Sequence, residues 1–82
     1  MKTLRSRGHR VLLAVLVDVR RGAGLTQRGL AARLKLPQSY VSKIETGERR
    51  IDPVECATWA RACGLDPADF FGRFVASLGR RV

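Results

Sequence analysis

The stretch 27-QRGLAARLKLPQSYVSKIET-46 carries two short helical patterns on either side of a tight turn. Thr26 is a suitable N-cap for the first pattern, and Pro37 pre-sets the first turn of the second. Ala31 is small enough for two helices to cross closely. The apolar seam that both helices would share consists of Leu30, Leu34, Leu36, Val41 and Ile44. This arrangement is typical of a helix-turn-helix unit, which we expect over residues 27–46.

The second helix of this unit turns polar side chains away from the seam. If Val41 and Ile44 face the core, the helical period places a polar group on the opposite side. That group consists of Gln38, Ser39, Ser42 and Lys43. Glutamine can pair with adenine, lysine can donate to guanine, and serine accepts several bases, so the group suits a DNA major groove. A solvated helix face has a similar composition, and these residues alone leave both interpretations open.

The charge of the whole chain favours an anionic partner. Sixteen Lys and Arg residues against seven Asp and Glu residues give a formal net charge of +9. Such an excess attracts polyanions, and most of these cations are arginines, whose planar fork suits phosphate and guanine. Composition therefore indicates nucleic acid first and an anionic membrane surface second.

The remaining sequence predicts three more helices and no strand. Apolar residues recur at helical spacing over about 9–21, 53–63 and 66–78. The predicted connections are short, and 82 residues form one small domain. We therefore expect an all-α, compact five-helix bundle that occupies residues 9–78.

The two ends of the chain differ from this domain. Residues 1–8 hold three cations and no acid, so they are expected to form a flexible basic arm that follows DNA or stays solvated. Residues 79–82 form a short tail. The apolar run 11–19 is interrupted by Asp18 and is far below the roughly 20 residues of a membrane-spanning helix. Neither a membrane segment nor a secretory signal is expected.

The residues that carry catalysis or bind metals form no recognisable pattern. Cys56 and Cys63 would lie about 10 Å apart on one helix, which is too far for a disulfide bond. With His9 as the one obvious third ligand and no zinc-type spacing, no metal or cofactor is expected. The sequence also lacks a nucleophile with a nearby base, so an enzyme is not expected.

A longer stretch, 24-GLTQRGLAARLKLPQSYVSKIETGERR-50, resembles the Cro and phage-repressor (XRE-type) DNA-binding domains of bacteria and their phages. The strongest matches are the Leu-Thr-Gln opening, the Leu30–Ala31 pair, SYVSKIETGER and a later Gly-Leu pair. The similarity extends from about Val11 to Phe71. It implies a lambda-repressor-like fold that binds double-stranded DNA sequence-specifically at the nucleoid, in the bacterial cytoplasm.

The resemblance also implies roles for individual positions. The base-reading positions are Gln38, Ser39, Ser42 and Lys43. The positions that contact the DNA backbone are Gln27, Thr46, Arg49 and Arg50. Arg20 and Glu45 match a structural ion pair. Two residues depart from the family: Lys35 stands where glycine is usual and would have to adopt φ > 0, and Pro37 replaces a hydroxyl N-cap.

The last predicted helix has a surplus of apolar residues that suggests a subunit interface. We expect a homodimer whose interface consists of Phe71, Phe74, Val75 and Leu78. A symmetric dimer would place its two recognition helices about 34 Å apart on a near-palindromic operator, as a repressor does. The alternative is that Phe70 and Phe74 seal the core of a monomer.

Three other side chains are less decisive. Tyr40 could pack against the core or contact a phosphate, and Trp59 is expected in the core. His9 is expected to be solvated.

Two other functional classes stay open. An antitoxin or a protein-interaction adaptor could use this fold, although an adaptor would not need Lys43, Arg49 and Arg50 on one side. A nonspecific RNA or membrane binder would spread its cations among aromatic residues or along an amphipathic helix. Here the aromatic residues gather in the last helix.

Overall fold

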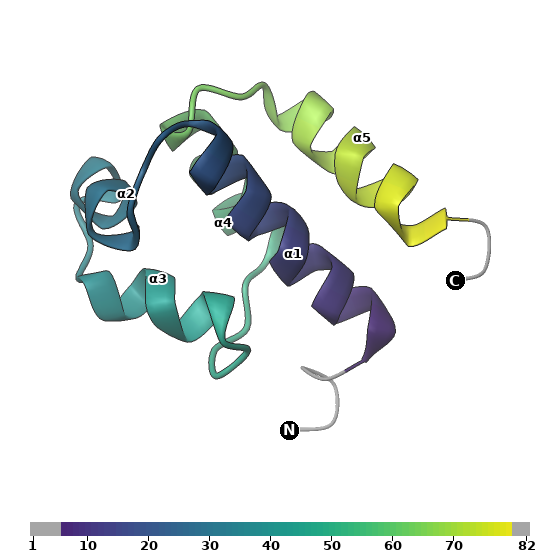
Figure 1. The fold of residues 1–82 in the computed structure, drawn as a ribbon, viewed down its shortest axis with the longest axis horizontal. Helices are drawn as coiled ribbons and strands as arrows, with labels where there is room; N and C mark the ends of the chain where they lie inside the picture. Colours follow the sequence, from purple (N-terminus) through teal and green to yellow (C-terminus); the bar gives the residue numbers. More distant parts are fainter. Residues whose placement is uncertain (1–5, 80–82) are drawn as a thin grey trace.

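The computed structural model of the chain describes residues 6–79, which form five α-helices and no strand (Figure 1). This confirms the all-α prediction. The helices are α1 (Arg7–Gly22), α2 (Gln27–Leu34), α3 (Gln38–Glu45), α4 (Pro53–Ala62) and α5 (Pro67–Leu78).

The first helix begins earlier than expected. The Ser6 hydroxyl accepts a hydrogen bond of 3.1 Å from the backbone N–H of His9 and caps α1, so Arg7 and Gly8 are helical. The predicted arm over residues 1–8 was therefore too long by these positions, and residues 1–5 lie outside the described part of the chain. At the other end Gly79 caps α5, and the rest of the predicted tail is not described.

The turn between α2 and α3 has the conformation that the sequence predicted. Lys35 adopts φ 58° and ψ 40°, and it is the one non-glycine residue with positive φ among residues 6–79. A left-handed conformation costs an ordinary residue about 1 to 2 kcal/mol. Pro37 takes the N-cap position of α3 and makes no side-chain hydrogen bond there. The recognition helix, α3, therefore begins without a side-chain cap.

The hydrophobic core draws on all five helices. Its buried residues are Val15, Leu16, Val19, Leu30, Ala31, Val41, Ile44, Cys56, Trp59, Ala60 and Phe70. Trp59 is fully buried, and its indole Nε1 donates a 3.2 Å hydrogen bond to the Leu16 carbonyl oxygen. This confirms that Trp59 is a core residue.

One predicted core residue is exposed. The side chain of Leu36 is 42% exposed, so its assignment to the shared seam was wrong. Leu36 lies in the turn between the left-handed Lys35 and Pro37, the N-cap of α3. Helical spacing does not determine the direction of a side chain at such a position. The seam between α2 and α3 is instead closed by Leu30, Val41 and Ile44.

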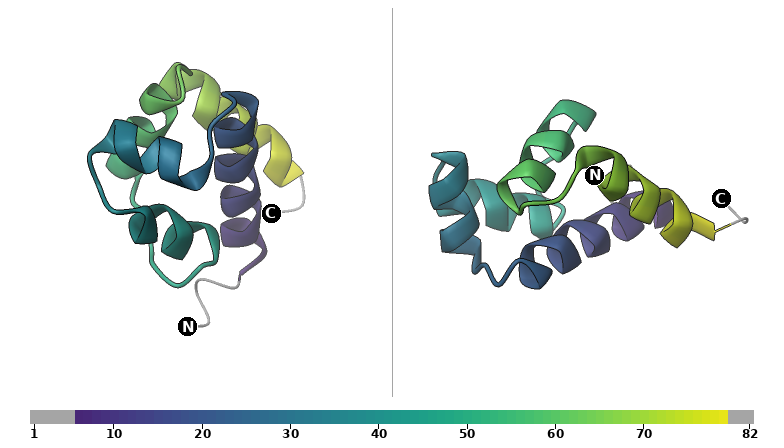
Figure 2. Two further views of the ribbon diagram at one scale, coloured as in Figure 1. Left: turned by 60° about the vertical axis from the view of Figure 1, so that its left-hand side comes forward. Right: turned by 90° about the horizontal axis from the view of Figure 1, so that it is seen from above.

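The helices place the helix-turn-helix unit at one end of the molecule. The helices α2 and α3 pack against each other at this end, α5 lies at the other end, and α1 lies between them and packs against both α3 and α5 (Figures 1 and 2). The helix α4 packs against α2, α1 and α5. This leaves one face of α3 uncovered.

Two further observations concern the two cysteines and the question of a membrane-spanning helix. Cys56 and Cys63 are free thiols, and burial raises the pKa of Cys56 to about 11. No helix within residues 6–79 is both long enough and apolar enough to cross a membrane.

Candidate nucleic-acid interface

The recognition helix separates its apolar and polar residues between two faces. Val41 and Ile44 are fully buried against the other helices. Of the four side chains predicted to read bases, Gln38, Ser39 and Lys43 are exposed and Ser42 is half-buried. A helix with this division presents amide, hydroxyl and ammonium groups outward while its core contacts hold it in place.

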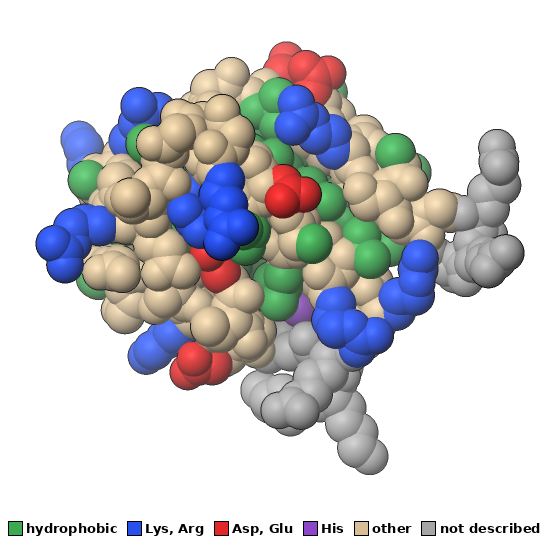
Figure 3. Space-filling model, viewed as in Figure 1, with side chains coloured by type: hydrophobic (Ala, Val, Ile, Leu, Met, Phe, Trp, Pro, Cys, Tyr) green, Lys and Arg blue, Asp and Glu red, His purple; other side chains and the backbone are tan. Residues whose placement is uncertain are grey.

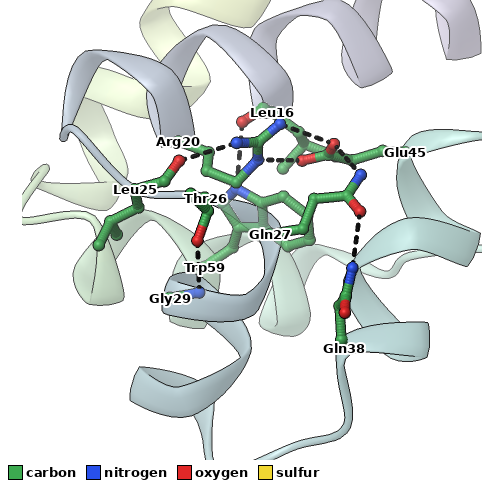
Figure 4. A network of polar contacts seen from close by, with 9 residues as sticks. All are labelled: Leu16, Arg20, Leu25, Thr26, Gln27, Gly29, Gln38, Glu45 and Trp59. Carbon is green, nitrogen blue, oxygen red and sulfur yellow. Dashed lines mark hydrogen bonds and ion pairs between the residues drawn. The ribbon is translucent and has the colours of Figure 1, made fainter.

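A chain of hydrogen bonds links this polar face to the interior (Figure 4). Gln38 Nε2 donates to Gln27 Oε1 over 3.4 Å, and Gln27 Nε2 donates to Glu45 Oε1 over 2.9 Å. Gln27 is the first residue of α2, so this chain joins the starts of α2 and α3 to the end of α3. These hydrogen bonds therefore orient both glutamine amides in the protein by itself.

The inner end of this chain is a buried ion pair. Arg20 Nε and Glu45 Oε2 are 2.7 Å apart, and Arg20 Nη2 donates to Glu45 Oε1 over 3.0 Å. Arg20 Nη1 also donates to the Leu25 carbonyl oxygen over 2.8 Å. The two charged side chains are 8% and 6% exposed. The hydrogen bonds to Glu45 raise the pKa of Arg20, so this bidentate contact stays charged and ties α1 to α3.

A second polar cluster lies on the other side of α3 and involves Arg49. The guanidinium carbon of Arg49 lies 4.8 Å from the centroid of the Tyr40 ring, and its Nη2 is 3.0 Å from Glu55 Oε2. The Tyr40 hydroxyl donates to the same carboxylate oxygen over 3.1 Å. Tyr40 thus packs between the recognition helix and α4, and Arg49, expected at a DNA phosphate, has an intramolecular partner.

The surface charge is uneven. Lys and Arg side chains lie over the α2 side and near the N-terminal end of α1, and acidic side chains lie between them and in a group near the start of α5 (Figure 3). Cations on the helix-turn-helix side would favour contact with a polyanion.

Comparison with known proteins agrees with this geometry. The helix-turn-helix family model matches residues 16–70, which include the whole of α2, α3 and α4. A solved structure described as an XRE-family like protein from Pseudomonas syringae pv. tomato str. DC3000 has 43% sequence identity, covers 92% of each chain and superposes with a TM-score of 0.81. The chain belongs to the XRE-type helix-turn-helix family. No curated protein gives a significant match.

The family is one of DNA-binding transcription regulators, and this XRE-type domain offers further polar groups next to α3. Thr46 Oγ1 lies 2.8 Å from Glu48 Oε2 and 3.3 Å from the Lys43 carbonyl oxygen. Arg50 is exposed in the same loop. Glu48, to which no role was assigned from the sequence, accepts a hydrogen bond from the Thr46 hydroxyl and directly precedes Arg49.

The position of His9 in this XRE-type domain differs from the prediction. His9 is half-buried, and its Nε2 is shielded from solvent without a hydrogen-bond partner among residues 6–79. It lines a hollow of about 450 Å³ with residues 49–52 and Glu55. Burial and the nearby Arg50 charge lower its pKa. The prediction of a solvated His9 was wrong, because α1 places this ring beside the α3–α4 loop.

The residues predicted to form the dimer interface are distributed unevenly on α5. Val75 is 62% exposed, whereas Phe71, Phe74 and Leu78 are half-buried. Phe70 lies in the core and packs edge-on against Phe71, with ring centroids 5.1 Å apart. The apolar strip that stays exposed on α5 is therefore narrower than the sequence alone indicates.

Proposed function

We propose that this protein is a sequence-specific transcriptional repressor that binds double-stranded DNA as a homodimer. The observation that carries the proposal is the division of α3, whose apolar face is fully buried while its polar face is uncovered. A helix presented in this way by a helix-turn-helix unit enters the major groove with its N-terminal residues leading.

The proposed base readers are Gln38, Ser39, Ser42 and Lys43. Gln38 is oriented by Gln27, which suits bidentate recognition of one base, and Lys43 is an exposed donor in the last turn of α3. Gln27, Thr46 and Arg50 are the proposed contacts to the DNA backbone, which set the register without reading sequence, whereas Arg49, the fourth residue expected there, is paired with Glu55.

The proposed dimer would form through α5. Phe71, Phe74, Val75 and Leu78 present a partly exposed apolar strip that a second copy could cover, and a symmetric pair of α3 helices about 34 Å apart would match a near-palindromic operator. The site of action would be the nucleoid in the bacterial cytoplasm.

Selection of bound duplexes from a random pool tests this function. We expect an enriched, near-palindromic motif with half-sites about one helical turn apart, and a dimer by sedimentation at the concentrations used. If no motif is enriched and affinity follows salt concentration alone, specific regulation is excluded and only charge-driven binding remains.

A further inference from the structure

We infer that Glu55 is a positioning residue for DNA recognition, which fixes the angle of α3 through Tyr40 and holds Arg49 away from the DNA phosphates. The inference rests on the proposed role of α3 as the reading helix. It assigns a role in recognition to a residue of α4 that has no place in the helix-turn-helix unit itself.

The geometry of one carboxylate supports this role. Glu55 Oε1 accepts from the Asp52 backbone N–H over 3.0 Å, and the Glu55 N–H donates to Asp52 Oδ1 over 2.7 Å, which completes a capping box at the start of α4. Glu55 Oε2 is left for Tyr40 and Arg49, at 3.1 and 3.0 Å. The capping box therefore fixes the carboxylate that α3 and the following loop bind.

The position of Tyr40 makes this contact relevant to DNA reading. Tyr40 is in the middle of α3, between the reading pairs Gln38–Ser39 and Ser42–Lys43. The start of α3 has no side-chain cap and follows the strained Lys35. The angle of this eight-residue helix must then be set by contacts along its length. One of them is the Tyr40–Glu55 hydrogen bond, which joins α3 to α4 on the side away from the Arg20–Glu45 pair.

The charges explain why Arg49 stays in the cluster. Arg49 stacks on the Tyr40 ring, pairs with Glu55, and its Nη1 donates to the Arg50 carbonyl oxygen over 2.8 Å. If Arg49 moved to a phosphate, it would leave a carboxylate without its cation near the DNA. Burial and the hydrogen bond to Glu55 raise the pKa of Tyr40 to about 12, so its hydroxyl remains a donor at neutral pH. Arg49 therefore helps to orient α3 through Tyr40 and Glu55 and does not move to a phosphate.

The test uses the full chain and the operator obtained by selection, with Tyr40→Phe, Arg49→Lys and Glu55→Gln as variants. Each variant should lose about tenfold in operator affinity, in the range of coupling between contacting residues. Affinity for unrelated duplex should stay the same in Tyr40→Phe and Arg49→Lys, and should stay the same or rise in Glu55→Gln, which removes a negative charge and releases Arg49. Arg49→Lys keeps the charge but loses the planar fork and the stacking, so its salt dependence should equal that of the unchanged protein. The double variant Tyr40→Phe/Glu55→Gln should lose no more than the larger single effect.

Asp52→Ala is the matched control. It removes the other half of the capping box without touching Tyr40 or Arg49, so it should lower the thermal unfolding midpoint and leave the preference for the operator intact. An equal loss of preference in Asp52→Ala would assign the effect to α4 stability and overturn the inference.

Two other results are decisive. If Tyr40→Phe and Glu55→Gln keep the operator preference while Arg49→Ala reduces the salt slope by about one on every sequence, Arg49 is a phosphate contact and the inference is wrong. If the unchanged protein itself prefers no sequence, the proposed function fails, and the inference fails with it.

Discussion

The recognition helix is held on two sides by polar contacts that differ in burial: Glu45 of α3 pairs with Arg20, and Tyr40 of α3 donates to Glu55, which itself pairs with Arg49. On the α1 side the side chains of Arg20 and Glu45 are 8% and 6% exposed, whereas on the α4 side those of Arg49 and Glu55 are 43% and 27% exposed. A buried pair cannot lose one member without leaving an uncompensated charge, but a half-exposed pair can exchange its partner for water. The first contact therefore bears on whether α3 docks at all, and the second on how it is oriented.

The largest effect is expected from breaking the buried contact. Arg20→Ala would leave Glu45 without its cation and the Leu25 carbonyl without its donor, and should cost about 3 to 5 kcal/mol of unfolding free energy, measured by urea titration at pH 7. The double variant Arg20→Met/Glu45→Met is the control and should recover part of this loss. A cost in Arg20→Ala as small as that of a surface pair would show that the contact is not effectively buried.

The next largest effect is expected from Lys43, one of the proposed base-reading side chains of α3. Lys43→Ala should relax the preference at one base pair in each half-site by about 1 to 3 kcal/mol, measured by competition between operator variants. Arg50→Ala is the comparison variant, and it should weaken all sequences alike and reduce the salt slope by about one. Uniform weakening in both variants would mean that Lys43 also contacts the backbone.

A smaller effect is expected at Lys35, in the turn before α3, which neither the Arg20–Glu45 contact nor the contacts of Glu55 involve. Lys35→Gly would remove the side chain that disfavours φ 58° and should stabilise the protein by about 0.5 to 1 kcal/mol, after the greater chain entropy of glycine is subtracted. The urea midpoint measures this change. Lys35→Ala keeps the β-carbon and should give no comparable gain, so equal stabilisation by alanine would contradict the explanation.

The smallest effect is expected in the pH dependence of the unfolding free energy, through the Tyr40–Glu55 hydrogen bond on the α4 side. Burial and the hydrogen bond to Glu55 raise the pKa of Tyr40 from its ordinary value of 10.0 to about 12 in the fold. A raised folded pKa means that the stabilisation is complete below pH 10 and is lost as the pH rises towards 12. The unfolding free energy should therefore fall more in the unchanged protein than in Tyr40→Phe across this interval. Parallel curves for the two proteins would show that Tyr40 does not titrate in this way.

Local signals in the sequence predict much of this arrangement. The five helices follow from apolar spacing and from cap residues such as Thr26 and Asp66. The left-handed Lys35 follows from the family resemblance, because glycine is usual at its position. The contact between Arg20 and Glu45 follows from the family resemblance rather than from spacing, because 25 residues separate them.

What the sequence does not predict depends on tertiary contacts or on positions outside helices. Leu36 belongs to a turn, where helical spacing gives no direction. The capping box of Asp52 and Glu55 can be recognised from the residue pattern alone, but the approach of Tyr40 to Glu55 requires α3 and α4 to be placed. His9 likewise meets the α3–α4 loop across some forty residues of chain.

The burial of Trp59 has a spectroscopic consequence. The chain has one tryptophan, and its indole is sealed in the core with its N–H held by a carbonyl of α1. Its fluorescence should report the integrity of the fold and remain constant when duplex is added. A variant that fails to bind DNA can then be classified as unfolded or as folded but inactive from its emission spectrum alone.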